Sequence, residues 1–152
     1  MNALKRRQSA WIGLGSLIVM LAGCAGMGAV TLGGDQENPP VTTAASGTAN
    51  ITVADDKSVS GSVTTTGVAG TVAHIHNGAT GKNGPVIIPL TKSGDNMWLV
   101  PAGAKLTDAQ YADYKAGNLY VNVHSAANKG GEIRAQLNAG GRSTSSGSGM
   151  GY

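Results

Sequence analysis

Apolar and more polar side chains alternate strictly along the segment Leu119-Tyr120-Val121-Asn122-Val123-His124-Ser125. A period of two residues is typical of a β-strand that buries one of its faces. The leucine and the two valines are then expected on the buried face, with Tyr120, Asn122 and His124 on the other. The segment therefore predicts one strand of a sheet, over residues 118–125, with a histidine on its polar face.

A second alternating segment, residues 70–77, carries the other two histidines of the chain, His74 and His76. Residues i and i+2 of a strand share a face and lie roughly 6.5–7 Å apart, so both imidazoles can reach one ion at about 2 Å. If the two strands are neighbours, His124 joins them. The sequence thus predicts a site for one metal ion formed by His74, His76 and His124, and imidazole ligands suit copper or zinc.

A competing interpretation gives these histidines a structural role, in hydrogen bonds with the backbone or with Glu132 and Arg134. Glu132 and Arg134 can also form a cross-strand ion pair, which contributes little to stability when it is exposed. In the metal hypothesis the side chains of Asn122, Tyr120, Glu132 and Arg134 surround the ligands and orient them.

Short strands joined by turns are predicted over most of the remaining chain. We expect them at residues 29–32, 47–54, 59–63, 85–90, 97–100 and 132–138, and segment 85–90 is apolar enough for a buried strand. One short helix is predicted at residues 107–116, because Thr107 can cap it and Gly117 can end it. This pattern indicates an all-β protein, an antiparallel sandwich or barrel, with one short helix.

Composition and charge give no support for a nucleic-acid partner. The 152 residues suffice for one domain, and the chain has a net charge of +3 and a pI near 9.2. Three of the positive charges are Lys5, Arg6 and Arg7. From residue 24 onward the chain has eight basic and eight acidic residues, whose charges cancel. The basic character therefore belongs to the amino-terminal segment, and the rest of the chain is neutral.

The amino-terminal segment has the layout of a bacterial lipoprotein signal. Its basic residues 5–7 precede an apolar run over residues 10–21, which is short for a membrane span. Leu21-Ala22-Gly23-Cys24 then resembles a lipobox, in which the cysteine is lipidated and the signal is removed before it. Cys24 is also the only cysteine, so no disulfide can form within the chain. The alternative is an ordinary signal peptide or an uncleaved anchor.

The lipoprotein interpretation divides the chain into four parts. These are a signal peptide (1–23), a lipidated anchor and linker (24–29), a domain (30–138) and a flexible tail rich in Gly and Ser (139–152). Acyl chains such as palmitate on Cys24 would hold the exported protein at a membrane of the cell envelope. Ala25 is not an acidic retention residue. In a bacterium with two membranes we therefore expect the outer membrane, with the domain facing the periplasm or the surface.

Three motifs, in order, resemble the CHRD domain, the module of chordin that also occurs singly in bacteria. They are Gly34-Asp35-Gln36-Glu37-Asn38-Pro39-Pro40-Val41-Thr42-Thr43-Ala44-Ala45-Ser46-Gly47, then Ala73-His74-Ile75-His76 with Gly84-Pro85-Val86, then Leu119 to His124 with Gly130-Gly131-Glu132-Ile133-Arg134. The resemblance runs from about residue 32 to residue 137. Lys129 and Ala135 depart from the family pattern, where Pro and Gly are usual. The resemblance implies an all-β, immunoglobulin-like sandwich.

The family resemblance implies no defined biochemical role, so the function rests on the histidines. Their spacing is also similar to the copper side of copper/zinc superoxide dismutase, which makes a superoxide-dismutase-like fold the alternative, by analogy at motif level. We favour a non-enzymatic binding module that coordinates one copper or zinc ion. The alternatives are a redox-active copper enzyme with dismutase-like chemistry, and a metal-free structural or adhesive domain of the envelope. The sequence specifies no protein partner.

Overall fold

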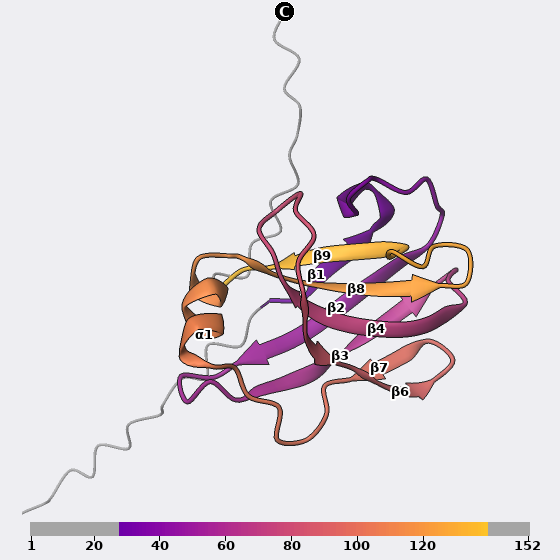
Figure 1. The fold of residues 1–152 in the computed structure, drawn as a ribbon. Coiled ribbons are helices and arrows are strands. Elements are labelled where there is room, and N and C mark those ends of the chain that lie inside the picture. Colours follow the sequence, from indigo (N-terminus) through magenta and orange to yellow (C-terminus); the bar gives the residue numbers. More distant parts are fainter. Residues whose placement is uncertain (1–27, 140–152) are drawn as a thin grey trace, which may run out of the picture.

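The computed structural model describes residues 28–139 (Figure 1). The predicted signal peptide, Cys24 and the tail beyond Ala139 lie outside these residues. The described chain forms nine strands, one α-helix and one 3-10 helix. In chain order these are β1 (Val30–Gly33), η1 (Gly34–Gln36), β2 (Ser46–Val53), β3 (Val59–Thr66), β4 (Gly70–Asn77), β5 (Val86–Pro89), β6 (Thr91–Gly94), β7 (Met97–Leu99), α1 (Asp108–Lys115), β8 (Leu119–Ser125) and β9 (Ile133–Leu137).

All nine strands belong to one antiparallel sheet that curls into a nearly closed barrel. The strand order is β5-β4-β8-β9-β1-β2-β3-β7-β6. The two strands at the ends of this order, β5 and β6, are joined in the chain by Leu90 alone. Lys92 of β6 also donates a hydrogen bond to the Gly70 carbonyl of β4 at 2.9 Å. This confirms the prediction of an all-β antiparallel fold, in its barrel form.

The inside of the barrel is the hydrophobic core. Its largest side chain is Trp98. Tyr114 adds a second ring, and the other core side chains are aliphatic and come from nearly every strand. β4 contributes Ala73 and Ile75, and the neighbouring strand β8 contributes Val121 and Val123. These are the residues that alternate with the histidines, so the histidines point out of the barrel.

The outward face of β4, β8 and β9 is polar, yet most of it is buried beneath loops. Arg134 is only 1% exposed and Asn122 only 2%. The covering chain comes from residues 37–43, 78–85 and 126–131, and η1 lies next to β9 (Figure 1). We call the sheet residues on this face the outer polar layer: His74, His76, Tyr120, Asn122, His124 and Arg134.

The one predicted helix is confirmed as α1, at one end of the barrel (Figure 1). The Thr107 hydroxyl accepts from the Gln110 backbone N–H, and the Gln110 side chain accepts from the Thr107 backbone N–H. This reciprocal capping box satisfies two donors that the helix start would leave unpaired. Gly117 follows with φ +76°, a conformation that ends a helix without strain only at glycine. Within residues 28–139 no helix has the length and apolarity needed to cross a membrane.

Two expectations for the middle of the chain are wrong. Segment 85–90 was expected as a buried strand, but in β5 only Ile88 is buried, and Val86 is 48% exposed. Strand β6 was not expected, because Thr91–Gly94 is polar and exposed at all four positions. Both strands lie at the open edges of the sheet, where backbone pairing on one side suffices and no apolar period is needed.

Truncating one valine on each face of the β4–β8 pair should show which face is buried in the core. We expect Val121→Ala to lower the free energy of unfolding by about 2 kcal/mol, because it removes two fully buried methyl groups and leaves a cavity. The matched change Val72→Ala, on the outward face of β4, should stay within about 0.5 kcal/mol. Urea unfolding measures both, and equal losses would contradict the assignment of faces.

Candidate metal centre

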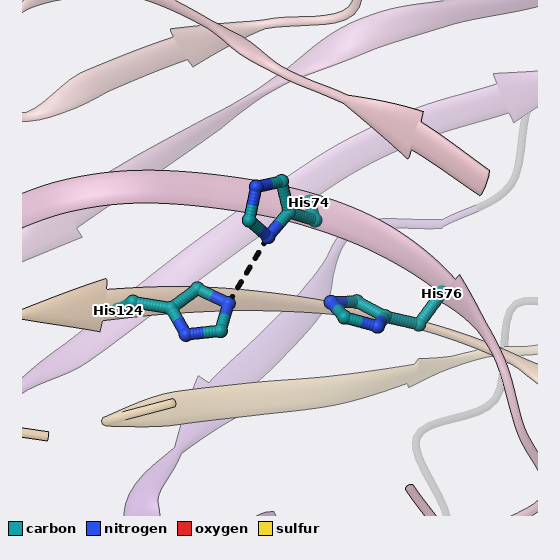
Figure 2. Close-up of side chains that lie close together, drawn as sticks. All are labelled: His74, His76 and His124. Atoms are coloured by element: carbon teal, nitrogen blue, oxygen red, sulfur yellow. Dashed lines mark hydrogen bonds between the residues drawn. The ribbon is translucent and has the colours of Figure 1, made fainter. Parts of the chain in front are cut away.

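The three histidines converge because β4 and β8 are neighbours in a fixed register. His74 lies opposite Asn122 and His76 opposite Tyr120, while His124 follows Asn122 on the same face of β8. One ring nitrogen from each histidine falls within 4.8 Å of the others. Figure 2 shows the rings gathered over the two strands, with His74 and His124 in contact. The predicted triad is thus brought together in space.

Register irregularities flank the triad on both sides of β4. The β4–β8 ladder shifts between Gly70 and Val72, and the β4–β5 ladder shifts between Ile75 and His76. A bulge increases the local twist and changes the direction of nearby side chains, and bulges are frequent at functional sites. Here they lie just before His74 and at His76, the two triad residues that β4 contributes.

Backbone carbonyls fix which nitrogen of two rings is available. His124 Nδ1 lies 2.9 Å from the Lys129 carbonyl oxygen, and His76 Nδ1 lies 2.9 Å from that of Gly84. A carbonyl only accepts, so each Nδ1 carries the proton and donates. In the neutral rings Nε2 then holds the lone pair, which is the form that binds a metal ion.

The available nitrogens fit a metal ion. His76 Nε2 is buried and has no hydrogen-bond partner among the described residues. His74 Nδ1 lies 3.1 Å from His124 Nε2, whereas two nitrogens bound at about 2.0–2.1 Å to one ion can be at most about 4 Å apart. The widest separation, 4.8 Å, must close by less than about 1 Å to meet that limit.

The surroundings favour the neutral form of the His74 and His76 rings over the positively charged form. Burial lowers the pKa of His74, and the neighbouring His124 and His76 lower it further. Burial also lowers the pKa of His76, against the raising effects of the Gly84 carbonyl and the Asn122 side chain. A lowered imidazole pKa favours the neutral ring at neutral pH. A metal ion would therefore compete with fewer protons for the ring nitrogens of His74 and His76.

The model of the CHRD domain family matches residues 29–137. The chain belongs to the CHRD family. Among curated proteins and solved structures, no match was found. In this CHRD domain the three sequence motifs meet at one place: the second and third supply the histidines, and the first supplies residues 37–41 of the loop that covers the outer polar layer.

Tyr120 and Arg134 support one side of the histidine cluster by stacking. The Tyr120 ring lies parallel to His76, with centroids 4.7 Å apart, and the Arg134 guanidinium lies 3.3 Å from the Tyr120 centroid. Arg134 donates to the Ala79 and Lys82 carbonyls at 3.3 and 2.9 Å, and so holds the 78–85 loop over the sheet. These contacts fix the plane of His76.

Glu132 lies apart from this stack. Its carboxylate accepts a hydrogen bond from the Thr43 hydroxyl at 2.8 Å, which ties the first motif to the third. The expected ion pair between Glu132 and Arg134 is absent from the ion pairs of residues 28–139, and the histidines bond to backbone carbonyls and to one another instead.

Glu37 is a buried acid that the sequence interpretation missed. It is 6% exposed, and its Oε1 has no hydrogen-bond partner among the described residues. Burial raises the pKa of Glu37 to about 7, against the lowering effects of the Arg134 charge and of hydrogen bonds from Asn122 and the Asn38 backbone. The only signal for it was its place in the Gly34-Asp35-Gln36-Glu37 motif, since an isolated Glu in a turn normally faces water.

Glu37→Gln should remove a specific pH dependence of the metal-free domain. The folded protein holds a proton on Glu37 up to about pH 7, whereas the unfolded chain releases it near 4.5. Wild-type stability therefore falls as pH rises through this window, because the unfolded state binds fewer protons there. The free energy of unfolding of Glu37→Gln, relative to wild type, should rise by about 3 kcal/mol between pH 4.5 and pH 8. Urea unfolding in a chelator measures this, and parallel pH profiles would contradict it.

Proposed function

We propose that this CHRD domain binds one divalent metal ion through His74, His76 and His124. The observation that carries the proposal is His76 Nε2, a buried lone pair with no hydrogen-bond partner among residues 28–139. It belongs to a cluster whose other two ring nitrogens lie within 4.8 Å. A purely structural histidine normally satisfies both ring nitrogens, because an unpaired buried acceptor costs about 1–3 kcal/mol.

Copper is the favoured ion and zinc the alternative. Three imidazole nitrogens suit both, and for such ligands divalent affinities peak at copper. The only thiol of the chain is that of Cys24, the residue proposed to be lipidated, so the cysteine-rich sites typical of structural zinc do not apply. The proposed role is that of a non-enzymatic binding module. The half-exposed His74 provides a route by which the ion enters and leaves.

We also propose that the domain is exported and anchored in the cell envelope by lipid on Cys24. The basic residues 5–7, the apolar run over 10–21 and the Leu21-Ala22-Gly23-Cys24 box support this, since they occur in the order of a lipoprotein signal. The family match begins at residue 29, a few residues after the cysteine. This arrangement would hold the metal centre close to a membrane surface, facing the periplasm or the outside.

Single and triple replacement of the histidines tests the metal proposal. Wild type, purified without a His tag, should bind one equivalent of Cu²⁺ or Zn²⁺. His74→Ala, His76→Ala and His124→Ala should each weaken binding strongly, because two imidazoles are left. Metal at a hundredfold excess over Kd should stabilise the wild type by about 2.7 kcal/mol and raise its Tm. Titration calorimetry and thermal unfolding supply both readouts.

The control for this series is a histidine-free site in an unchanged fold. The triple Ala variant should keep the far-ultraviolet circular dichroism of a β-protein and show no thermal shift with metal. If the wild type takes up no metal, or if the triple variant takes up as much, then the histidines are structural and the metal proposal fails.

The anchor is tested independently with Cys24→Ser. This change should abolish incorporation of labelled palmitate in bacteria and move the protein from the membrane to the soluble fraction, because serine has no thiol to acylate. A matched change at the next residue, Ala25→Ser, should leave both labelling and fractionation unchanged. Unlabelled wild type, with the Cys24→Ser variant still in the membrane fraction, would exclude the lipid anchor.

A further inference from the structure

Asn122 occupies the centre of the outer polar layer, between the two histidine-bearing strands. It lies directly opposite His74 across the β4–β8 ladder and two residues before His124 on the same face of β8. Its side chain is almost completely buried, at 2% exposure, and its Oδ1 has no hydrogen-bond partner among the described residues. The position alone brings a carboxamide oxygen to the edge of the histidine triad.

The direction of the carboxamide follows from its neighbours. A Cβ built on Gly131 would lie 2.6 Å from Asn122 Nδ2 and 2.3 Å from Glu37 Oε1. The Asn122 NH₂ group therefore faces the Gly131 loop, where the Gly130 carbonyl oxygen lies at 3.5 Å and the Glu37 carboxyl is adjacent. The Gly130 carbonyl oxygen can only accept, so the nitrogen belongs on that side and Oδ1 points the other way.

On the other side lie the histidines. Asn122 is opposite His74 in the β4–β8 ladder and stands between Tyr120, which is opposite His76, and His124 on the same face of β8. With the proton of His76 on Nδ1, the ring offers a lone pair at Nε2. Two buried acceptors, Asn122 Oδ1 and His76 Nε2, thus lie without a donor beside the triad. Such a pair is stabilised by a cation.

From this arrangement we infer that Asn122 Oδ1 is the fourth ligand of the metal ion. The inference rests on the proposed metal site and completes it as three imidazole nitrogens and one carboxamide oxygen. Four donors match the tetrahedral preference of Zn²⁺ and are also compatible with Cu²⁺. A neutral oxygen donor is a poor partner for the softer Cu⁺, so the centre should select divalent ions.

Glu37 and Gly131 act as positioning residues for this ligand. Glu37 touches no histidine in any contact the structure shows, but its carboxyl lies beside the Asn122 NH₂ group, on the side away from the triad. Gly131 has φ +130° and no side chain, which lets the carboxyl and the carboxamide come together. Glu37 of the first motif and Gly131 of the third motif therefore both orient the Asn122 side chain.

Asn122→Leu and Asn122→Asp test the ligand assignment on the full chain, with Zn²⁺ and Co²⁺ as probes. Leucine keeps the size and removes the oxygen, so Zn²⁺ affinity should fall at least about tenfold, and the visible bands of bound Co²⁺ should change because its coordination changes. Aspartate supplies a charged oxygen and should bind Zn²⁺ more tightly than wild type. Asn77→Leu is the matched control, because the Asn77 side chain donates to Asp113 at 2.7 Å and should leave binding unaltered.

The outcomes separate this inference from the site itself. If wild type binds metal and loses it with the histidines, yet Asn122→Leu keeps the Co²⁺ spectrum and the Zn²⁺ affinity, Asn122 is not a ligand and only the fourth-ligand inference fails. If wild type binds no metal, both proposals fail. Should Asn122→Leu not fold, as judged by circular dichroism, Asn122→Asp decides: an unchanged Co²⁺ spectrum and affinity would overturn the inference.

Discussion

The register between β4 and β8 aligns two alternating segments so that Ile75 meets Val121 inside the barrel and His74 meets Asn122 outside. Side chains alternate with a period of two, so a slip of one residue would place the imidazoles in the core and the valines outside. The hydrophobic effect on the inner face thus determines which side chains form the histidine cluster on the outer face. The core and the site have one common constraint, and the bulges beside His76 and before His74 only adjust it locally.

Loops then convert an exposed polar face into a buried one. Gly84 comes so close to the sheet that an added Cβ would lie 1.6 Å from the Asn77 carbonyl oxygen. This approach lets the Gly84 carbonyl accept from His76 Nδ1 while its N–H donates to the Tyr120 hydroxyl at 3.2 Å. Gly84 of the second CHRD motif therefore serves close backbone contact, and through it determines which nitrogen of the His76 ring carries the proton.

Sequence patterns predicted what depends on alternation and on local capping, including the strands of the triad, the face of each histidine and the helix after Thr107. They did not predict β6, whose polar residues 91–94 have no apolar period and pair with β7 across the two-residue turn at 95–96. They also missed Glu37, since nothing in residues 34–41 shows that its carboxyl packs beside Asn122 and Gly131, which lie 85 and 94 residues further along the chain. Burial of an acid by distant chain is a tertiary property, and composition and spacing carry no record of it.

The energetics of the outer polar layer favour a bound cation. Three of the five buried side-chain atoms without a partner in residues 28–139 are His76 Nε2, Asn122 Oδ1 and Glu37 Oε1. All three are acceptors, and each costs about 1–3 kcal/mol while it is unmet. A proton on Glu37 relieves one of them, which agrees with its raised pKa. The proposed ion, shared by His76 and Asn122, would relieve the other two. Because the cost falls on the metal-free fold, part of the binding energy would then return as stability, and metal affinity would be coupled to the folding of the barrel.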